Sequence, residues 1–124
     1  MNKTTILLVE DNAILAKMLN EELAEAGFEV LHAYDGEVGL RIAKKEIPSL
    51  ILLDILLPQM NGFDVLEALK KTKATKKIPV ILLTMLGSEK DKERGFSLGA
   101  TDYIVKSKYA LKEIVKKVKK LSTV

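Results

Sequence analysis

The chain contains no cysteine and no tryptophan, and only one histidine among 124 residues. Without cysteine it can form no disulfide, no thiolate nucleophile and no cysteine-ligated zinc site. No apolar run approaches the roughly 18 residues of a membrane-spanning helix, and the short apolar stretch near the start is too brief for the core of a signal peptide. We therefore expect a cytoplasmic protein without a membrane partner.

Arginine is also scarce. Basic residues outnumber acidic ones by 20 to 17, which gives a net charge of +3, but only Arg41 and Arg94 are arginines. Proteins that read bases more often use arginine, because its guanidinium makes bidentate contacts. Lysines spread in this way are typical of a solvated surface. Nucleic acid is therefore not expected as a partner.

Apolar runs alternate with amphipathic stretches along one domain that spans residues 1–124. Strands are expected at about 5–10, 29–34, 49–54, 79–85 and 101–105. Helices are expected at about 12–26, 37–46, 63–73, 88–98 and 109–121. Gly27 and Gly99 are placed to end two of these helices in the left-handed conformation. The alternation predicts an α/β protein, a five-stranded parallel sheet with five helices covering both faces.

Two strand orders are plausible for such a chain. The flavodoxin-like order 2-1-3-4-5 places the first and third strands side by side at the switch point, where ligands bind beyond the carboxyl ends of the strands. This order brings together the acidic residues that follow these two strands, Glu10 and Asp11 after the first and Asp54 after the third. Like charges held this close repel one another and need compensation. A hard divalent cation with oxygen ligands would supply it.

Two further polar residues end strands at the same edge. Thr84 closes the fourth strand and Lys106 closes the fifth. Together the five side chains offer three carboxylates, a hydroxyl and an ammonium group. A metal and a lysine can neutralise phosphoryl oxygens while a hydroxyl donates to another. The set therefore suits phosphoryl transfer to a carboxylate nucleophile.

At these residues the chain resembles the receiver domain of two-component response regulators. The resemblance covers essentially the whole chain. It rests on the motifs VEDN (9–12), LLDILLPQMNG (52–62), LLTM (82–85) and LGATDYIVK (98–106). It implies a phosphoacceptor signalling domain that catalyses only its own phosphorylation and dephosphorylation. The phosphoryl donor would be a sensor histidine kinase or a histidine phosphotransfer protein, and the output would be docking to a downstream protein.

The resemblance also implies a role for each site residue. Asp54 is the phosphoacceptor, while Thr84 and Lys106 bind the phosphoryl group. Tyr103 is the switch aromatic, which with Thr84 remodels the surface by turning inward on phosphorylation. The face made by the fourth helix, fifth strand and fifth helix allows a homodimer. The ligands of Mg²⁺ or Mn²⁺ are implied to be Glu10, Asp11, Asp54 and the backbone carbonyl of Leu56.

Two positions depart from the family pattern. Ser107 follows the site lysine, where the family usually has a proline joined by a cis bond. A cis bond before another residue costs about 3–4 kcal/mol, so a trans bond is expected here. Met85 follows Thr84, where the family usually has a small residue. Its long side chain is expected near the mouth of the site, and Leu56 is expected to flank the same approach.

Three other readings fit the pattern less well. An aspartyl-phosphate hydrolase of the haloacid dehalogenase type needs a second acid two residues after the nucleophile, and that position is Leu56. A flavin carrier needs a loop after the first strand that cradles phosphate, and Glu10 and Asp11 would repel it. A receiver-like module that is never phosphorylated would not need a complete acid, hydroxyl and lysine set.

Overall fold

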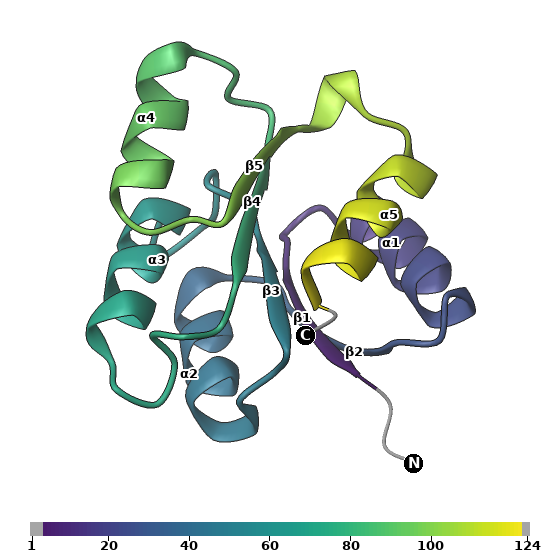
Figure 1. The fold of residues 1–124 in the computed structure, drawn as a ribbon, viewed down its shortest axis with the longest axis horizontal. Coiled ribbons are helices and arrows are strands. Elements are labelled where there is room, and N and C mark those ends of the chain that lie inside the picture. The colour runs from purple at the N-terminus through teal and green to yellow at the C-terminus, as the bar shows by residue number, and fades with distance from the viewer. Residues whose placement is uncertain (1–3, 123–124) are drawn as a thin grey trace.

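The computed structural model describes residues 4–122 and contains one all-parallel sheet with the strand order β2-β1-β3-β4-β5 (Figure 1). The strands are β1 (Thr5–Val9), β2 (Glu29–Ala33), β3 (Leu50–Leu53), β4 (Val80–Thr84) and β5 (Asp102–Val105). The helices are α1 (Ala13–Glu25), α2 (Gly36–Glu46), α3 (Gly62–Lys71), α4 (Glu89–Ser97) and α5 (Leu111–Ser122), with a short 3₁₀ helix η1 (Lys106–Lys108) before α5. The predicted fold class and strand order are confirmed.

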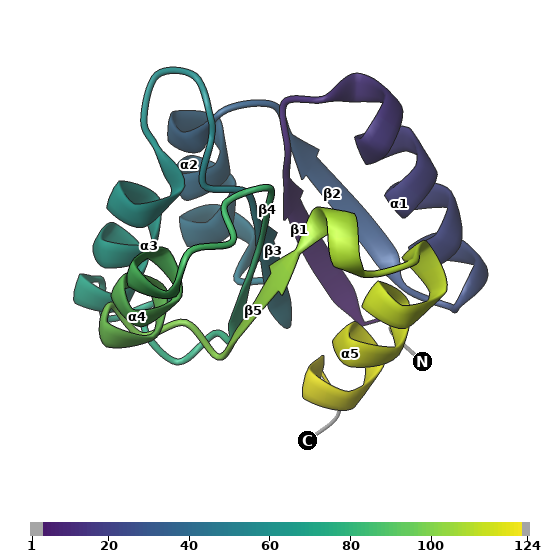
Figure 2. The ribbon, with the colours of Figure 1, turned by 90° about the horizontal axis from the view of Figure 1, so that it is seen from above.

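Helices cover both faces of the sheet. Helices α1 and α5 lie on one face, and α2, α3 and α4 lie on the other (Figure 2). Successive side chains of a strand point to opposite faces, so Leu7 packs in the core under α2 and α3 while Leu8 packs in the core under α1 and α5. Burial on both faces explains why β1, β3 and β4 are almost continuous apolar runs.

Local signals in the sequence set the helix ends. Four helices start at a residue whose side-chain oxygen accepts a hydrogen bond from the backbone N–H three residues later, and each such cap stabilises by about 1 kcal/mol. The capping residues are Asn12, Asp35, Asn61 and Ser88. Gly27 and Gly99 follow α1 and α4 with φ angles of +100° and +108°, so the expected left-handed helix ends are confirmed.

Two helix ends differ by two residues from the expected boundaries: α3 ends at Lys71 rather than near residue 73, and α5 begins at Leu111 rather than near residue 109. Residues 106–108 form the turn η1 instead, so the chain curls immediately after β5. The bond between Lys106 and Ser107 is trans, as are all other peptide bonds in residues 4–122. The trans geometry expected from the missing proline is confirmed.

Candidate functional site

Strand pairing carries two acidic residues to the carboxyl edge of the sheet. Val9 is paired with Leu53 across β1 and β3, so the residues that follow, Glu10 and Asp54, lie beside each other. The backbone ladder continues past the strand ends, because Asp54 N donates to the Val9 carbonyl at 3.0 Å and Glu10 N donates to the Ala33 carbonyl at 3.0 Å. Both acids are therefore held by the sheet itself.

The three acids gather as the sequence predicted. Oxygen atoms of Glu10, Asp11 and Asp54 lie within 4.8 Å of one another. Glu10 and Asp54 are only 1% and 4% exposed, whereas Asp11 faces solvent. Two buried carboxylates at this separation need a cation beside them.

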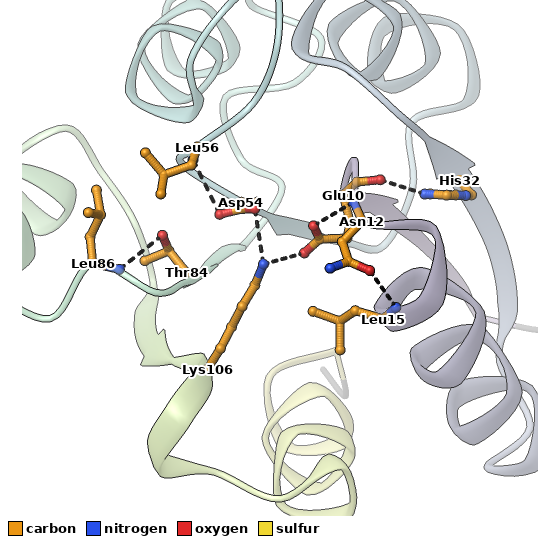
Figure 3. Close-up of polar contacts among 9 residues, drawn as sticks. All are labelled: Glu10, Asn12, Leu15, His32, Asp54, Leu56, Thr84, Leu86 and Lys106. Carbon is orange, nitrogen blue, oxygen red and sulfur yellow. Dashed lines mark hydrogen bonds and ion pairs between the residues drawn. The ribbon is translucent and has the colours of Figure 1, made fainter.

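Lys106 supplies a positive charge to this cluster. Its Nζ lies 2.7 Å from Glu10 Oε1 and donates a hydrogen bond to Asp54 Oδ2 at 3.0 Å (Figure 3). The ammonium group thus bridges the two buried acids from the end of β5. The sequence predicted that Lys106 would reach the site. In the structure its ammonium group forms two ion pairs there.

Burial and charge pairing act in opposite directions on the pKa values of Glu10 and Lys106. Burial raises the pKa of Glu10, and this outweighs the stabilisation of its charge by Lys106 and by Asn12 N, which donates to Oε2 at 3.1 Å. Burial alone would lower the pKa of Lys106, but Glu10 and Asp54 outweigh it, so the lysine pKa is raised and the group stays charged. A raised carboxyl pKa means that the neighbours of Glu10 do not fully offset the cost of burying its negative charge.

The donor set fits a divalent cation. Glu10 Oε1 receives no well-directed hydrogen bond despite its ion pair, and it is the one such buried side-chain atom within residues 4–122. With the exposed carboxylate of Asp11 and the buried carboxylate of Asp54, it offers the hard oxygen ligands that Mg²⁺ and Mn²⁺ prefer. The cluster Glu10, Asp11 and Asp54 is therefore a candidate metal site. The role expected of the Leu56 carbonyl stays a prediction.

Thr84 and Tyr103 meet at a shared neighbour, Leu86. The buried Thr84 accepts a hydrogen bond from Leu86 N at 3.3 Å, and the Tyr103 hydroxyl donates to the Leu86 carbonyl at 2.6 Å. The Tyr103 ring is already buried, with 7% exposed. The inward turn that we expected on phosphorylation therefore has no exposed starting position in this structure.

Tyr103 gives a spectroscopic test of this packing. Burial, with smaller contributions from the charges of Asp91 and Asp54, raises its pKa to about 12. Ultraviolet titration should show one phenol that ionises near pH 12, and Tyr103→Phe should remove this step while Tyr34→Phe leaves it. Because the folded pKa is raised, the phenol favours the folded state below pH 10, and this contribution is lost as the pH rises through 12. A titration without the late step would contradict the buried ring.

Sequence reasoning missed the residues that hold Glu10 in place. His32 Nε2 lies 2.8 Å from the Glu10 carbonyl oxygen, and its ring packs against Tyr34 with the ring centroids 4.0 Å apart. Leu8 is paired with His32 in the register of β1 and β2, which places the imidazole beside the end of β1. Pairing of the two predicted strands would have revealed this neighbour.

Leu56 and Met85 stand near the two strand ends that carry Asp54 and Thr84. Their side chains are 54% and 57% exposed, and Leu56 N donates to Asp54 Oδ1 at 3.3 Å. Both are large apolar groups beside a polar site. This agrees with the expectation that they border its mouth.

The family comparison agrees with this geometry. Residues 6–119 match the sequence model described as the response regulator receiver domain, and the chain belongs to this family. It is similar to the chemotaxis protein CheY4 of Vibrio cholerae, with a TM-score of 0.89, 29% identity and coverage of 97% of this chain and 99% of that one. It also resembles the Mn²⁺-bound response regulator Rcp1, with a TM-score of 0.84, 30% identity and coverage of 99% and 97%.

Curated relatives are longer proteins. The transcriptional regulatory protein CpxR of Escherichia coli K12 is 47% identical over 106 residues, which are 86% of this chain and 43% of CpxR. RpaA of Synechocystis, named a DNA-binding dual master transcriptional regulator, is 37% identical over 116 residues, 94% of this chain and 48% of RpaA. The chain spans about half the length of the curated relatives it matches.

The expectation that nucleic acid is not a partner is wrong on these findings, because the matched relatives are transcriptional regulators and one is named as DNA-binding. The scarcity of arginine argues only against the reading of bases by this domain. It gives no information about DNA binding by a regulator of twice the length. No helix in residues 4–122 is long and apolar enough to cross a membrane.

Proposed function

We propose that the chain is a single receiver domain that accepts a phosphoryl group on Asp54. The observation that carries this proposal is the setting of the Asp54 carboxylate. It is buried, bonded through one oxygen to Lys106 Nζ and through the other to Leu56 N, and flanked by Glu10.

In the proposed reaction an Asp54 oxygen attacks the phosphorus of the donor. A bond between this oxygen and phosphorus forms, and the bond from phosphorus to the donor's nitrogen or oxygen breaks, with its electron pair leaving on the donor. Lys106 releases Glu10 and pairs with one phosphoryl oxygen, and the Thr84 hydroxyl donates to another. The only reactions of the domain are its own phosphorylation and dephosphorylation.

Mg²⁺ is the metal that we propose for this site. Glu10, Asp11, Asp54 and the Leu56 carbonyl would hold it. When bound, such an ion neutralises charge on the acids and on the incoming phosphoryl oxygens. A bound ion would also give Glu10 a partner once Lys106 pairs with the phosphoryl group.

Intact-mass measurement after incubation with acetyl phosphate tests the proposal. We expect a gain of one phosphoryl group in the presence of Mg²⁺, and none with a chelator. Asp54→Asn keeps the shape of the side chain but removes the nucleophile, so it should not be labelled. Undiminished labelling of this variant, or labelling that ignores the chelator, would rule the proposal out.

The transcriptional relatives support a second, broader proposal. Because CpxR and RpaA are about twice as long as this chain, we propose that phosphorylation of this domain controls DNA binding in a regulator of that kind. Local charge at Asp54 would bias a two-state surface that such a regulator reads. DNA affinity of the regulator measured before and after phosphorylation tests this. Equal affinities would contradict it.

The lifetime of the aspartyl phosphate should be set partly by Leu56 and Met85. Hydrolysis needs a water placed in line with the bond to phosphorus, and neither side chain can hydrogen-bond a water well. Leu56→Asn offers the water a hydrogen bond and should therefore speed dephosphorylation by about three- to tenfold, the worth of one neutral hydrogen bond. Met85→Ala should also speed it, because the shorter side chain uncovers the approach of the water. Decay of the phosphoprotein after donor removal measures this. Phe96→Ala is the control, because Phe96 is an exposed apolar residue on α4. Unchanged decay in both site variants would refute the role of Leu56 and Met85 in setting the lifetime.

A further inference from the structure

The end of α3 and the segment that joins it to β4 carry a concentrated positive charge. Residues 70–77 read KKTKATKK, with five lysines and no acid; they are called the lysine segment below. Four of these lysines, Lys71, Lys73, Lys76 and Lys77, are exposed. Lys71 lies 3.5 Å from Glu67, while the other three make no ion pair within residues 4–122. Most of the charge of this segment is therefore uncompensated.

The lysine segment lies at the end of the sheet opposite the acidic site. Helices α2 and α3 both run away from the carboxyl edge and end at this pole (Figure 1), and the last turn of α2 adds Lys44 and Lys45. The molecule therefore has a negative pole at Asp54 and a positive pole at the lysine segment. An anion at the positive pole would not meet the repulsion of the acidic site.

The backbone of the lysine segment is held in one shape. The buried Thr75 hydroxyl donates to the Leu69 carbonyl at 2.7 Å, and the Thr72 hydroxyl donates to the Ala68 carbonyl at 2.8 Å. Lys70 turns inward, where its Nζ donates to the Ile78 carbonyl at 2.8 Å and to the Lys76 carbonyl at 3.2 Å. One lysine thus fixes the loop, and the others project from it. A preorganised surface lowers the entropy cost of binding.

We propose that the lysine segment contacts the phosphate backbone of duplex DNA. This inference rests on the proposed link between the domain and a DNA-binding regulator. Lysine binds phosphate as a point charge, and the segment contains no arginine, asparagine, glutamine or aromatic side chain with which to read bases. The contact is therefore independent of sequence and adds electrostatic affinity rather than specificity.

Helix α5 is the competing basic surface, and acids lie beside some of its lysines. Lys117 Nζ lies 3.3 Å from Asp102 Oδ2, and Lys112 shares a shallow surface hollow with Glu22 and Glu25 of α1. A polyanion approaching α5 would meet these acids. Exposed lysines of η1 and α5 therefore supply a control of equal charge.

Fluorescence anisotropy with a labelled duplex of mixed sequence tests the proposal on the 124-residue chain. Between about 25 and 150 mM salt, contact with four phosphates should give a slope of log K against log [salt] of about −3 to −4. Replacing Lys71, Lys73, Lys76 and Lys77 by glutamine should weaken binding at least about tenfold and flatten the slope toward −1. Replacing the exposed Lys108, Lys112, Lys116 and Lys120 by glutamine removes the same charge and should retain most of the slope.

Each outcome decides the proposal. Equal losses in the two variants would mean that net charge, and not the lysine segment, controls binding, and no salt-dependent binding by the parent chain would also overturn it. Displacement of the duplex by poly-glutamate as effective as by unlabelled DNA would assign the surface to acidic proteins instead. Thermal melting checks that both variants fold. Labelling by acetyl phosphate should be equal in all three proteins, so failure at Asp54 and failure at the lysine segment are seen separately.

Discussion

Replacing Lys106 by methionine is expected to lower the rate of Asp54 phosphorylation about 100-fold, the usual loss when one group that stabilises developing charge is removed. The same change should strengthen the binding of divalent cations. In the structure the ammonium group lies between Glu10 and Asp54, at 2.7 and 3.0 Å. A cation must displace it from Glu10, and methionine does not compete for either carboxylate.

The variant should also change the dependence of stability on pH. Without the ammonium group only the hydrogen bond from Asn12 N still offsets the burial of Glu10, so its already raised pKa should rise further. A carboxyl group with a raised pKa favours the folded state while it is protonated, and this contribution is lost as the pH rises through the folded pKa. Metal-free Lys106→Met should therefore lose stability from mildly acidic to neutral pH, and Mg²⁺ should restore it.

Three measurements on Lys106→Met check these expectations. Mn²⁺ affinity is measured by calorimetry, labelling by intact mass over time, and stability by thermal melting at several pH values. Lys108→Met is the matched control, because Lys108 is exposed in η1 and contacts neither acid. Unchanged Mn²⁺ affinity in Lys106→Met would show that the lysine does not compete with the metal.

The sequence predicted those features that backbone geometry determines. Glu10 and Asp54 meet because each directly follows a strand, and adjacent parallel strands end at one edge of a sheet. The ends of α1 and α4 were predicted because only glycine adopts positive φ without strain. The alternating apolar runs predict parallel strands and chain direction. The pairing of Glu10 with Asp54 also depends on the strand order, which was one of two plausible orders and which the structure confirms.

Features that depend on long side chains were not predictable in the same way. Lys106 was expected at the edge, but its bridge between two acids depends on how a flexible side chain is placed between competing charges. Tyr103 was expected to turn inward only on phosphorylation, but its ring is already buried in the core and its hydroxyl donates a hydrogen bond to the Leu86 carbonyl. Met85 and Leu56 lie where strand ends place them, but their effect on water depends on motion that no pattern of residues records.

Gly62→Ala is expected to destabilise the protein by about 3 kcal/mol or more, the upper end of the cost of overpacking. Helix propensity predicts the opposite sign, because alanine is better than glycine in a helix by about 1 kcal/mol. Gly62 begins α3 beside the acceptor strand, and a Cβ there would lie 2.2 Å from the Asp54 carbonyl oxygen and 2.6 Å from Ile55 Cα. Both neighbours are backbone atoms, so no side chain can move aside.

The helix cannot retreat from this clash without further loss. Gly62 N donates to the Ile55 carbonyl at 2.8 Å, and moving α3 away would break this bond and shift the Asp54 backbone that carries the nucleophile. Urea denaturation measures the expected loss of stability, and labelling should fall with the folded fraction. Gly87→Ala is the matched control, because a Cβ there would meet only Val105 methyl groups at 3.6 Å. Equal stability of Gly62→Ala and the parent would mean that α3 does not press on the acceptor loop as closely as the structure shows.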